Sequence, residues 1–399
     1  MKEVSFIHCA DLHLDSPIIG LRNLPSFIAD RLKESTFASF SAIIDQAIAC
    51  KVDFIIIAGD IFDGEDRSIR AQIRFRKEME RLHAHHIAAF IIHGNHDHLK
   101  GSWTKIEFPK NVYIFPKEVT AKAFYKGEMM VQLYGFSYEM RHVYERKIED
   151  YEKEKTGDYH IGILHGNLEG TSEHSAYAPF SLQDLAAKKM DYWALGHIHK
   201  RAILTENPLA VYPGNIQGRH KKEIGEKGAY LVQLNGMETK AEFFSTAPIV
   251  WKSVQVNAKG IQTVDELMLL MNRMIEEEKK TRISCILFVE IDQLMMEETI
   301  AAGELLEILQ QEAVEEAEFI WVASIKYQEN KKWAKENLVE ESAFYKELFA
   351  NASELSIVEK ALEPLYSHPA AHRYLAELTE KEKKELAIEA EDLLIKLLY

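Results

Sequence analysis

The sequence has few cysteines, no long apolar run and no low-complexity segment. Its three cysteines, Cys9, Cys50 and Cys285, are odd in number and widely spaced among 399 residues. This usage argues against a disulfide framework and favours a reducing cytoplasm. No stretch approaches the ~18 uninterrupted apolar residues of a membrane span, and the first residues carry no signal-peptide pattern. These absences predict a cytoplasmic globular protein that does not enter a membrane.

Excess positive charge is also missing. The chain carries a net charge of -15, which by itself disfavours nucleic acid as a partner. The negative charge is unevenly placed, however. Residues 1–250 hold 31 basic and 33 acidic side chains, whereas residues 251–399 hold 17 and 30. The nearly neutral N-terminal part therefore weakens the objection to a nucleic-acid substrate.

The N-terminal part alternates apolar runs with amphipathic stretches. Apolar runs at 4–10, 53–58 and 88–92 predict buried strands, and the apolar spacing within 27–49 and 68–86 predicts helices between them. This order implies right-handed crossovers and a largely parallel α/β core. Further strands are predicted at 112–115, 130–136, 160–164, 192–195 and 229–234, with a charged helix at 141–155.

A second pattern begins after Pro248. Strands at 251–256, 286–291 and 319–327 alternate with helices that begin near 264 and 302, which predicts a small β-α-β-α-β unit. Thr263 and Glu266 have the spacing of a capping box at the start of the first helix. Residues 330–399 are acidic and almost wholly helical in pattern, and a chain of this length is expected to form two or three domains.

Candidate metal ligands follow five of the predicted strands. Open α/β sheets carry their ligand-binding sites at the carboxyl ends of buried strands. We expect the five strands to deliver these side chains to one edge of one sheet. The candidates are Asp11, His13, Asp60, Asn95, His165, His197 and His199.

The donor types indicate the chemistry. Carboxylate, imidazole and amide oxygen together suit two divalent ions such as Mn²⁺, Fe²⁺ or Zn²⁺. The single carboxylate of Asp60 has two oxygens, enough to bridge both ions. Two metal ions about 3.5–4 Å apart are typical of phosphoryl transfer. Each short motif alone occurs by chance, whereas their conjunction in this order favours a metal site.

These motifs resemble the calcineurin-like metallophosphoesterase family over about residues 4–235. The resemblance is carried by Asp-x-His at 11–13, Gly-Asp-x-x-Asp at 59–63, Gly-Asn-His-Asp at 94–97, His165, and Gly-His-x-His at 196–199. It implies a layered α/β core of sheets flanked by helices. It also implies one metal held by Asp11, His13, Asp60 and His199, and a second held by Asp60, Asn95, His165 and His197.

The same resemblance assigns two further roles. His96 is expected to face the scissile phosphate as general acid and charge stabiliser, not as a metal ligand. Asp63 lies where related phosphatases place the carboxylate that orients this histidine, a position that the nuclease branch does not always keep acidic.

Later segments are similar to one branch of the family. Residues 192–200 and the following β-α-β-α-β unit resemble SbcD-type DNA repair nucleases, and residues 177–182 and 214–220 resemble the YhaO-type subgroup. This implies a nuclease domain at 1–248, a capping domain at 249–329 and a helical tail at 330–399. It further implies DNA as substrate, Mn²⁺ as the expected ion, a homodimer, and docking of the tail on an SbcC-type coiled-coil ABC ATPase.

Two basic groups are candidate DNA contacts. Arg67, Arg70, Arg74, Lys77 and Arg81 line one face of the helix at 68–86. They could guide DNA phosphates toward the metals, although a solvated face or subunit contact is favoured. Arg219 could bind a phosphate or pack within its own turn, and both readings stay open.

Three functions are compatible with these residues. The first is a two-metal DNA exonuclease or endonuclease in DNA repair. The second is a phosphodiesterase or phosphatase acting on a small molecule or phosphoprotein. The third, disfavoured because no ligand position is substituted, is a non-catalytic DNA- or partner-binding module.

Overall fold

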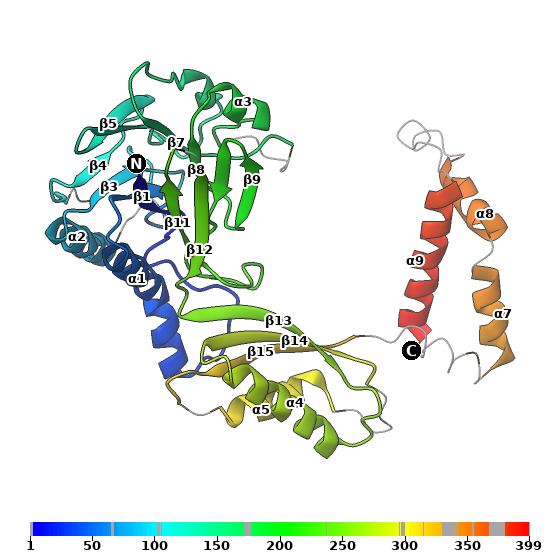
Figure 1. Cartoon of the computed structure of the whole chain (residues 1–399). Helices are drawn as coiled ribbons and strands as arrows, with labels where there is room; N and C mark the ends of the chain where they lie inside the picture. The colour runs from blue at the N-terminus through cyan, green and yellow to red at the C-terminus, as the bar shows by residue number, and fades with distance from the viewer. Residues whose placement is uncertain are drawn as a thin grey trace. The chain divides into compact units, whose positions relative to one another are not determined.

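The computed structural model describes residues 3–64, 68–101, 104, 106–170, 177–236, 238–294, 296, 300–313, 315–328, 339, 342–352, 355–366 and 380–398. The chain forms two compact units, and Figure 1 labels their helices and strands. The first comprises residues 1–254, 272–289 and 303–324, and the second comprises 255–271, 290–302 and 325–399. The predicted domain boundaries at 248 and 329 stay predictions.

The first sheet contains the strands that carry the N-terminal motifs. Strands β1 to β4 run parallel, whereas β11 is antiparallel to both β1 and β12. Cys9 pairs with Ile57 and Ile57 with Ile91, so the carboxyl ends of β1, β2 and β3 lie level. In spatial order the strands are β12 (Thr239–Ser245), β11 (Gly228–Leu234), β1 (Val4–Cys9), β2 (Phe54–Ala58), β3 (Ala88–Ile92) and β4 (Val112–Ile114).

A second six-stranded sheet carries the later motifs. Its central strands β6, β7, β8 and β10 are parallel, and each edge strand is antiparallel to its neighbour. The order is β5 (Thr120–Lys126), β6 (Met129–Gly135), β7 (Tyr159–His165), β8 (Tyr192–Gly196), β10 (Leu209–Tyr212) and β9 (Ala202–Glu206). The expectation that the five ligand-bearing strands belong to one sheet is therefore wrong, since β1, β2 and β3 lie in the first sheet and β7 and β8 in the second. Polar residues after a strand do not indicate which sheet the strand joins.

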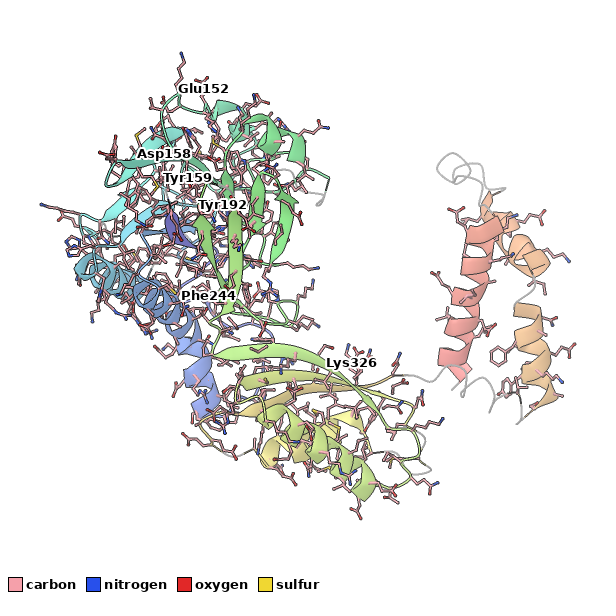
Figure 2. The ribbon with its side chains drawn as sticks, viewed as in Figure 1. Glu152, Asp158, Tyr159, Tyr192, Phe244 and Lys326 are labelled. Carbon is pink, nitrogen blue, oxygen red and sulfur yellow. The ribbon has the colours of Figure 1, made fainter. Side chains whose placement is uncertain are left out.

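An apolar layer lies between the two sheets. Phe6, Phe54 and Ile56 of the first sheet and Leu133 and Ile161 of the second belong to one buried cluster. A polar contact crosses this layer, since the Tyr192 hydroxyl (Figure 2) lies 2.9 Å from Nδ1 of His8. Burial lowers the pKa of His8 to about 3, so this histidine is neutral.

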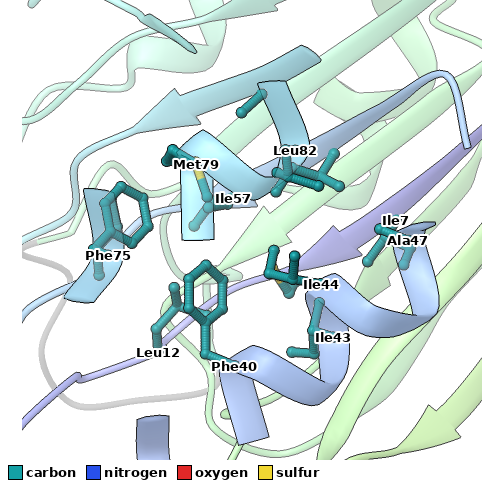
Figure 3. Close-up of a cluster of buried hydrophobic side chains, with 14 of the residues drawn as sticks. Ile7, Leu12, Phe40, Ile43, Ile44, Ala47, Ile57, Phe75, Met79 and Leu82 are labelled. Carbon is teal, nitrogen blue, oxygen red and sulfur yellow. The ribbon is translucent and has the colours of Figure 1, made fainter. Parts of the chain in front are cut away.

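Helices cover the outer faces. Two long helices, α1 (Ser26–Ala49) and α2 (Ile69–Ala84), pack on the first sheet, and Figure 3 shows Phe40, Ile44 and Met79 of these helices against Ile7 and Ile57 of β1 and β2. The second sheet is covered by α3 (Leu182–Ala187) and the 3₁₀ turn η1 (Lys147–Asp150). The layered α/β fold class is confirmed.

The β-α-β-α-β prediction is also confirmed. Strands β13 (Ile249–Asn257), β14 (Ser284–Asp292) and β15 (Ile320–Tyr327) form a three-stranded sheet in that order, alternating along the chain with α4 (Val264–Lys279) and α5 (Ala302–Gln311). The capping box at α4 is present, since Glu266 N–H donates to Thr263 Oγ1 and Thr263 N–H to Glu266 Oε2, both at 3.2 Å.

The described part of the tail is helical, as predicted. Helices α7 (Ala343–Ala352), α8 (Leu355–Tyr366) and α9 (Glu380–Leu398) form a small group around buried Phe349, which packs with Tyr345 and Leu394. In the part of the chain that the structure describes, no helix combines the length and apolar character of a membrane span.

The helix predicted at 141–155 is wrong. Only Lys147–Asp150 forms a 3₁₀ turn, and Val143 before it makes a β-bridge with Tyr177. Val143 is buried, whereas His142 and Tyr144 on either side of it are exposed. This alternation is typical of an extended backbone and not of a helix. The edge strands β5, β9 and β12 were not predicted, because their half-exposed, mixed sequences lack a buried strand's pattern.

Candidate metal centre

Six of the predicted ligands lie in loops that follow their strands, and His165 is the last residue of β7. Four of them have positive φ angles: Asp11 (52°), His13 (42°), Asp60 (51°) and His197 (101°). Such angles are uncommon for residues other than glycine and persist where surrounding contacts hold them. Backbone hydrogen bonds do so here, since Asp11 N–H donates to Gly59 O and His13 N–H to Asp60 O. The β1 and β2 loops thus brace each other.

One group of ligand atoms gathers around His13. Its Nε2 lies 3.1 Å from Nε2 of His199 and 3.9 Å from Oδ2 of Asp60. Side-chain atoms of Asp11, His13 and His199 all lie within 4.8 Å of one another, a spacing that could hold a metal ion. Both oxygens of Asp11 also accept the His197 N–H, at 3.1 and 3.2 Å.

A second group gathers around His165. Its Nε2 lies 3.0 Å from Oδ1 of Asn95 and 3.4 Å from Oδ2 of Asp60. The Nδ1 of His197 lies 3.1 Å from the same Asn95 oxygen. Asp60 is therefore common to both groups, and the structure brings all seven predicted ligands together from two sheets.

Hydrogen bonds behind two histidines orient them toward the site. The Nδ1 of His165 lies 2.9 Å from Ala58 O, and the Nδ1 of His199 lies 2.6 Å from Oε1 of Glu223. Because these acceptors hold a proton on Nδ1, each Nε2 is the nitrogen that faces the site. In His165 that nitrogen faces the oxygens of Asn95 and Asp60, where a positive charge, either a proton on Nε2 or a metal cation, removes their repulsion. The donor set fits divalent metals.

The electrostatics agree with a cation site. Burial opposes the charged form of His165, but Asp60 and Asp11 outweigh it and raise its pKa to about 9. Burial likewise opposes ionisation of Asp60, yet His165, His13 and His96 hold the pKa of Asp60 well below its usual range. Burial lowers the pKa of His13 to about 4 and that of His197 to about 3, so both are neutral and ready to bind metal.

His96 lies next to the predicted ligands, and its side chain forms a further group with those of His13 and Asp63, whose ligand atoms lie within 4.8 Å of one another. Its backbone N–H donates to Oδ1 of Asp60 at 2.9 Å, and its Nδ1 lies 2.9 Å from Oδ1 of Asp63. Burial disfavours the His96 cation, but Asp63 and Asp60 outweigh burial and raise its pKa. Asp63 also accepts a hydrogen bond from Ser16 Oγ at 2.7 Å, so its carboxylate is held beside the imidazole.

Arg219 lies on the same side of the site. Its Nη1 donates to Ser16 Oγ at 2.8 Å and lies 3.4 Å from Oδ2 of Asp63. Its side chain is only 11% exposed, and no hydrogen-bond partner of its buried Nε is found within the described ranges. The positive charge of Arg219 lies near His96 and lowers the pKa of that histidine, against the raising effect of Asp63 and Asp60.

The basic face of α2 is different. Arg70 Nη1 lies 2.7 Å from Oδ1 of Asp15, and Arg70 also pairs with Glu34, which binds Arg74 as well. These guanidinium groups already have carboxylate partners. Arg67 lies outside the described residues.

Glycines make the close approach of the loops possible. A Cβ on Gly94 would lie 2.3 Å from Oδ1 of Asp60 and 2.6 Å from Nε2 of His165, and a Cβ on Gly59 would lie 2.2 Å from Nδ1 of His165. These distances are far below contact, so either side chain would displace a ligand. The glycines of both motifs are needed for the packing of the site.

The sequence did not point to Glu223. Its carboxylate is buried and accepts hydrogen bonds from Arg219 N–H at 2.8 Å and Asn215 Nδ2 at 3.0 Å, besides its contact with His199. His199 and Arg219 outweigh the effect of burial and lower its pKa to about 2. The signal that could have found it is the polar turn-rich segment 213–223, close after a ligand-bearing loop.

Comparisons with known proteins agree with this geometry. The family model described as calcineurin-like phosphoesterase matches residues 4–201. The uncharacterized metallophosphoesterase YhaO of Bacillus subtilis (strain 168) is 38% identical over 402 aligned residues, which cover 99% of this chain and 98% of that protein.

Similarity to DNA repair proteins is lower and covers less of the chain. The DNA double-strand break repair protein Mre11 of Thermoplasma acidophilum is 27% identical over 57% of this chain and 60% of its own length. Its namesake from Sulfurisphaera tokodaii is 28% identical over 59% of this chain and 61% of its own length.

Proposed function

The chain belongs to the calcineurin-like phosphoesterase family and is a phosphoester hydrolase, and from that premise we propose that it cleaves phosphodiester bonds of DNA during repair with two bound metal ions. The observation that carries the proposal is the convergence of seven ligand side chains beside His96 and Asp63. We assign one ion to Asp11, His13, Asp60 and His199, and the second to Asp60, Asn95, His165 and His197.

The metals supply Lewis acidity to the phosphate and a water nucleophile at neutral pH. Mn²⁺ suits this mixture of carboxylate, amide and imidazole donors. Oδ2 of Asp60 lies 3.9 Å from Nε2 of His13 and 3.4 Å from Nε2 of His165, so this carboxylate would be a ligand common to both ions.

His96 acts as the general acid. Because Asp63 keeps the proton on Nδ1 of His96 and favours its cationic form, Nε2 can deliver a proton to the leaving oxygen. Arg219 binds a phosphate oxygen of the substrate. The support for this role is a nearly buried guanidinium, beside the general acid, whose Nε has no hydrogen-bond partner among the described residues.

DNA is proposed as the substrate because relatives described as DNA double-strand break repair proteins are 27% and 28% identical over 57% and 59% of this chain. We give Arg70 and Arg67 a lesser part in binding DNA, since Arg70 is already paired with Asp15 and Glu34.

A partner is proposed for the tail. The described helices expose large apolar side chains, among them Phe344, Ile388 and Leu393. We assign this surface to docking on an SbcC-type coiled-coil ABC ATPase and propose that the chain works as a homodimer in the cytoplasm.

The test uses the purified full chain loaded with Mn²⁺. Linear duplex DNA, single-stranded DNA and a chromogenic phosphodiester are offered to it and to a His96→Asn variant, with metal content measured in both. We expect DNA cleavage that falls by about 10²–10⁴-fold in the variant while bound metal is unchanged.

Two outcomes overturn the proposal. Hydrolysis of the small ester without His96-dependent action on any DNA, even with the ATPase subunit added, would make the protein a small-molecule phosphodiesterase. Failure to bind metal would leave only a binding function.

A further inference from the structure

Residues 140–144, beside the metal centre, expose apolar and aromatic side chains. Met140 and Tyr144 are 58% and 69% exposed, and His142 between them is also exposed. Val143 is buried and pairs with Tyr177 by a β-bridge. Around this bridge the backbone turns Val143 inward and presents His142 and Tyr144, its neighbours on either side, to solvent.

The rings of Tyr177, His142 and Tyr144 form a continuous series that begins at the predicted metal ligand His197. The Tyr177 ring centroid lies 4.6 Å from that of His197, the His142 ring lies 5.6 Å from Tyr177, and the Tyr144 ring lies 6.0 Å from His142. His142 and Tyr144 are stacked, with 19° between their planes. The series leads from the buried centre to an exposed tyrosine at its outer end.

We propose that Met140, His142 and Tyr144 form a platform on which unpaired nucleobases of the substrate strand stack while a neighbouring phosphate occupies the metal centre. The inference rests on the proposed function and adds to it a preference for single-stranded DNA at this position. Flat exposed rings in series are the usual means of binding unpaired bases, since every base has a π-face. A paired base in a duplex has no such face free.

The segment carries charge of both signs, since Glu139 is paired with Lys100 and Lys117 and Glu145 is exposed. Arg141, exposed within the same segment, can contact the backbone between stacked bases. Large apolar side chains that are exposed close together beside an active site also indicate a ligand, whereas single apolar residues scattered over a surface do not.

The test measures binding separately from cleavage. In EDTA and at one fixed salt concentration, the full chain is titrated into fluorescent single-stranded oligothymidylate and into an abasic oligonucleotide with the same phosphates. Tyr144→Ala should weaken binding of oligothymidylate about 5- to 100-fold and leave binding of the abasic strand nearly unchanged. Tyr144→Trp should restore the lost affinity.

Tyr125→Ala is the matched control, since Tyr125 is 65% exposed on β5 and lies outside the ring series; its affinity should equal that of the wild type. Equal binding of oligothymidylate by Tyr144→Ala and wild type would overturn the platform, even if the Mn²⁺-loaded wild type cleaves DNA. Absence of any DNA cleavage by the wild type would instead overturn the proposed function. With Mn²⁺, the ratio of single-stranded DNA cleavage to small-ester hydrolysis should fall in Tyr144→Ala.

Discussion

Oε1 of Glu223 lies 2.6 Å from Nδ1 of His199, and this contact joins two loops that follow different strands. Glu223 belongs to the turn-rich segment after β10, whereas His199 follows β8. Because the pKa of Glu223 is lowered to about 2, its carboxylate is ionised at neutral pH and fixes the tautomer of the histidine. A residue with no place in the metal motifs thus orients one of the proposed ligands.

Replacing this carboxylate should weaken metal binding without removing a ligand. Glu223→Gln keeps the size of the side chain but loses its charge, so His199 becomes less basic and less firmly oriented. We expect the affinity for Mn²⁺ to fall about 10- to 100-fold, measured by isothermal titration of the metal-free protein. Glu226→Gln, an exposed glutamate three residues later, should bind Mn²⁺ like the wild type. Equal affinity in the Glu223 variant would limit Glu223 to holding its own turn together.

Gly94 is expected to tolerate no side chain. In Gly94→Ala the new methyl group would lie 2.3 Å from Asp60 Oδ1 and 2.6 Å from His165 Nε2, so both side chains must move apart. Fewer than two metal ions per chain should remain bound, as determined by elemental analysis after dialysis. Gly303→Ala is the control, because nothing lies within 4 Å of its added methyl group and alanine favours a helix. Two ions bound to Gly94→Ala would show that the loop can adjust.

Asp97 should act on stability rather than on chemistry. Its buried carboxylate accepts hydrogen bonds from Ile61 N–H at 3.0 Å and Gly94 N–H at 2.7 Å, and it lies 2.8 Å from Nδ1 of His93. Asp97→Asn puts an NH₂ group opposite a donor, so we expect a loss of about 1–3 kcal/mol. Thermal unfolding of the metal-free protein would measure it. Asp45→Asn, at an exposed ion pair with Arg81, should change the transition little. Equal transitions for the two variants would contradict a bracing role for Asp97.

Much of the site was accessible from the sequence because its motifs are local. Asp11, Asp60 and Asn95 each follow a short apolar run, and that pattern predicts both a buried strand and a polar loop at its end. The partition of the strands between two sheets was not accessible, since strand pairing depends on contacts between distant segments. Glu223 was missed for the same reason: a lone glutamate in a turn acquires its role only when the fold brings His199 to it.

The segment around Val143 shows another limit. Its charged neighbours favoured a helix, but one buried bridge to Tyr177 makes the backbone extended. Tertiary contacts override weak helical propensity in this way. The error hid the ring series, because His142 and Tyr144 lie on one side of the backbone only where the chain is extended.

Asp63 should set the pH range over which His96 works as an acid. The hydrogen bond and the charge of Asp63 both raise the pKa of His96, and a general acid must be protonated, so activity should decline as pH rises through that pKa. Asp63→Asn removes the charge of Asp63 and leaves that of Asp60, so the pKa of His96 should fall and the alkaline limb of kcat/KM should move to lower pH. His96→Asn should lower kcat by about 10²–10⁴-fold and abolish that limb. The measurement is a pH–rate profile on a chromogenic phosphodiester at saturating Mn²⁺, with bound metal determined at each pH. A limb that stays in place in Asp63→Asn would mean that the limb reports another group and that Asp63 serves chiefly to hold Ser16 and Arg219.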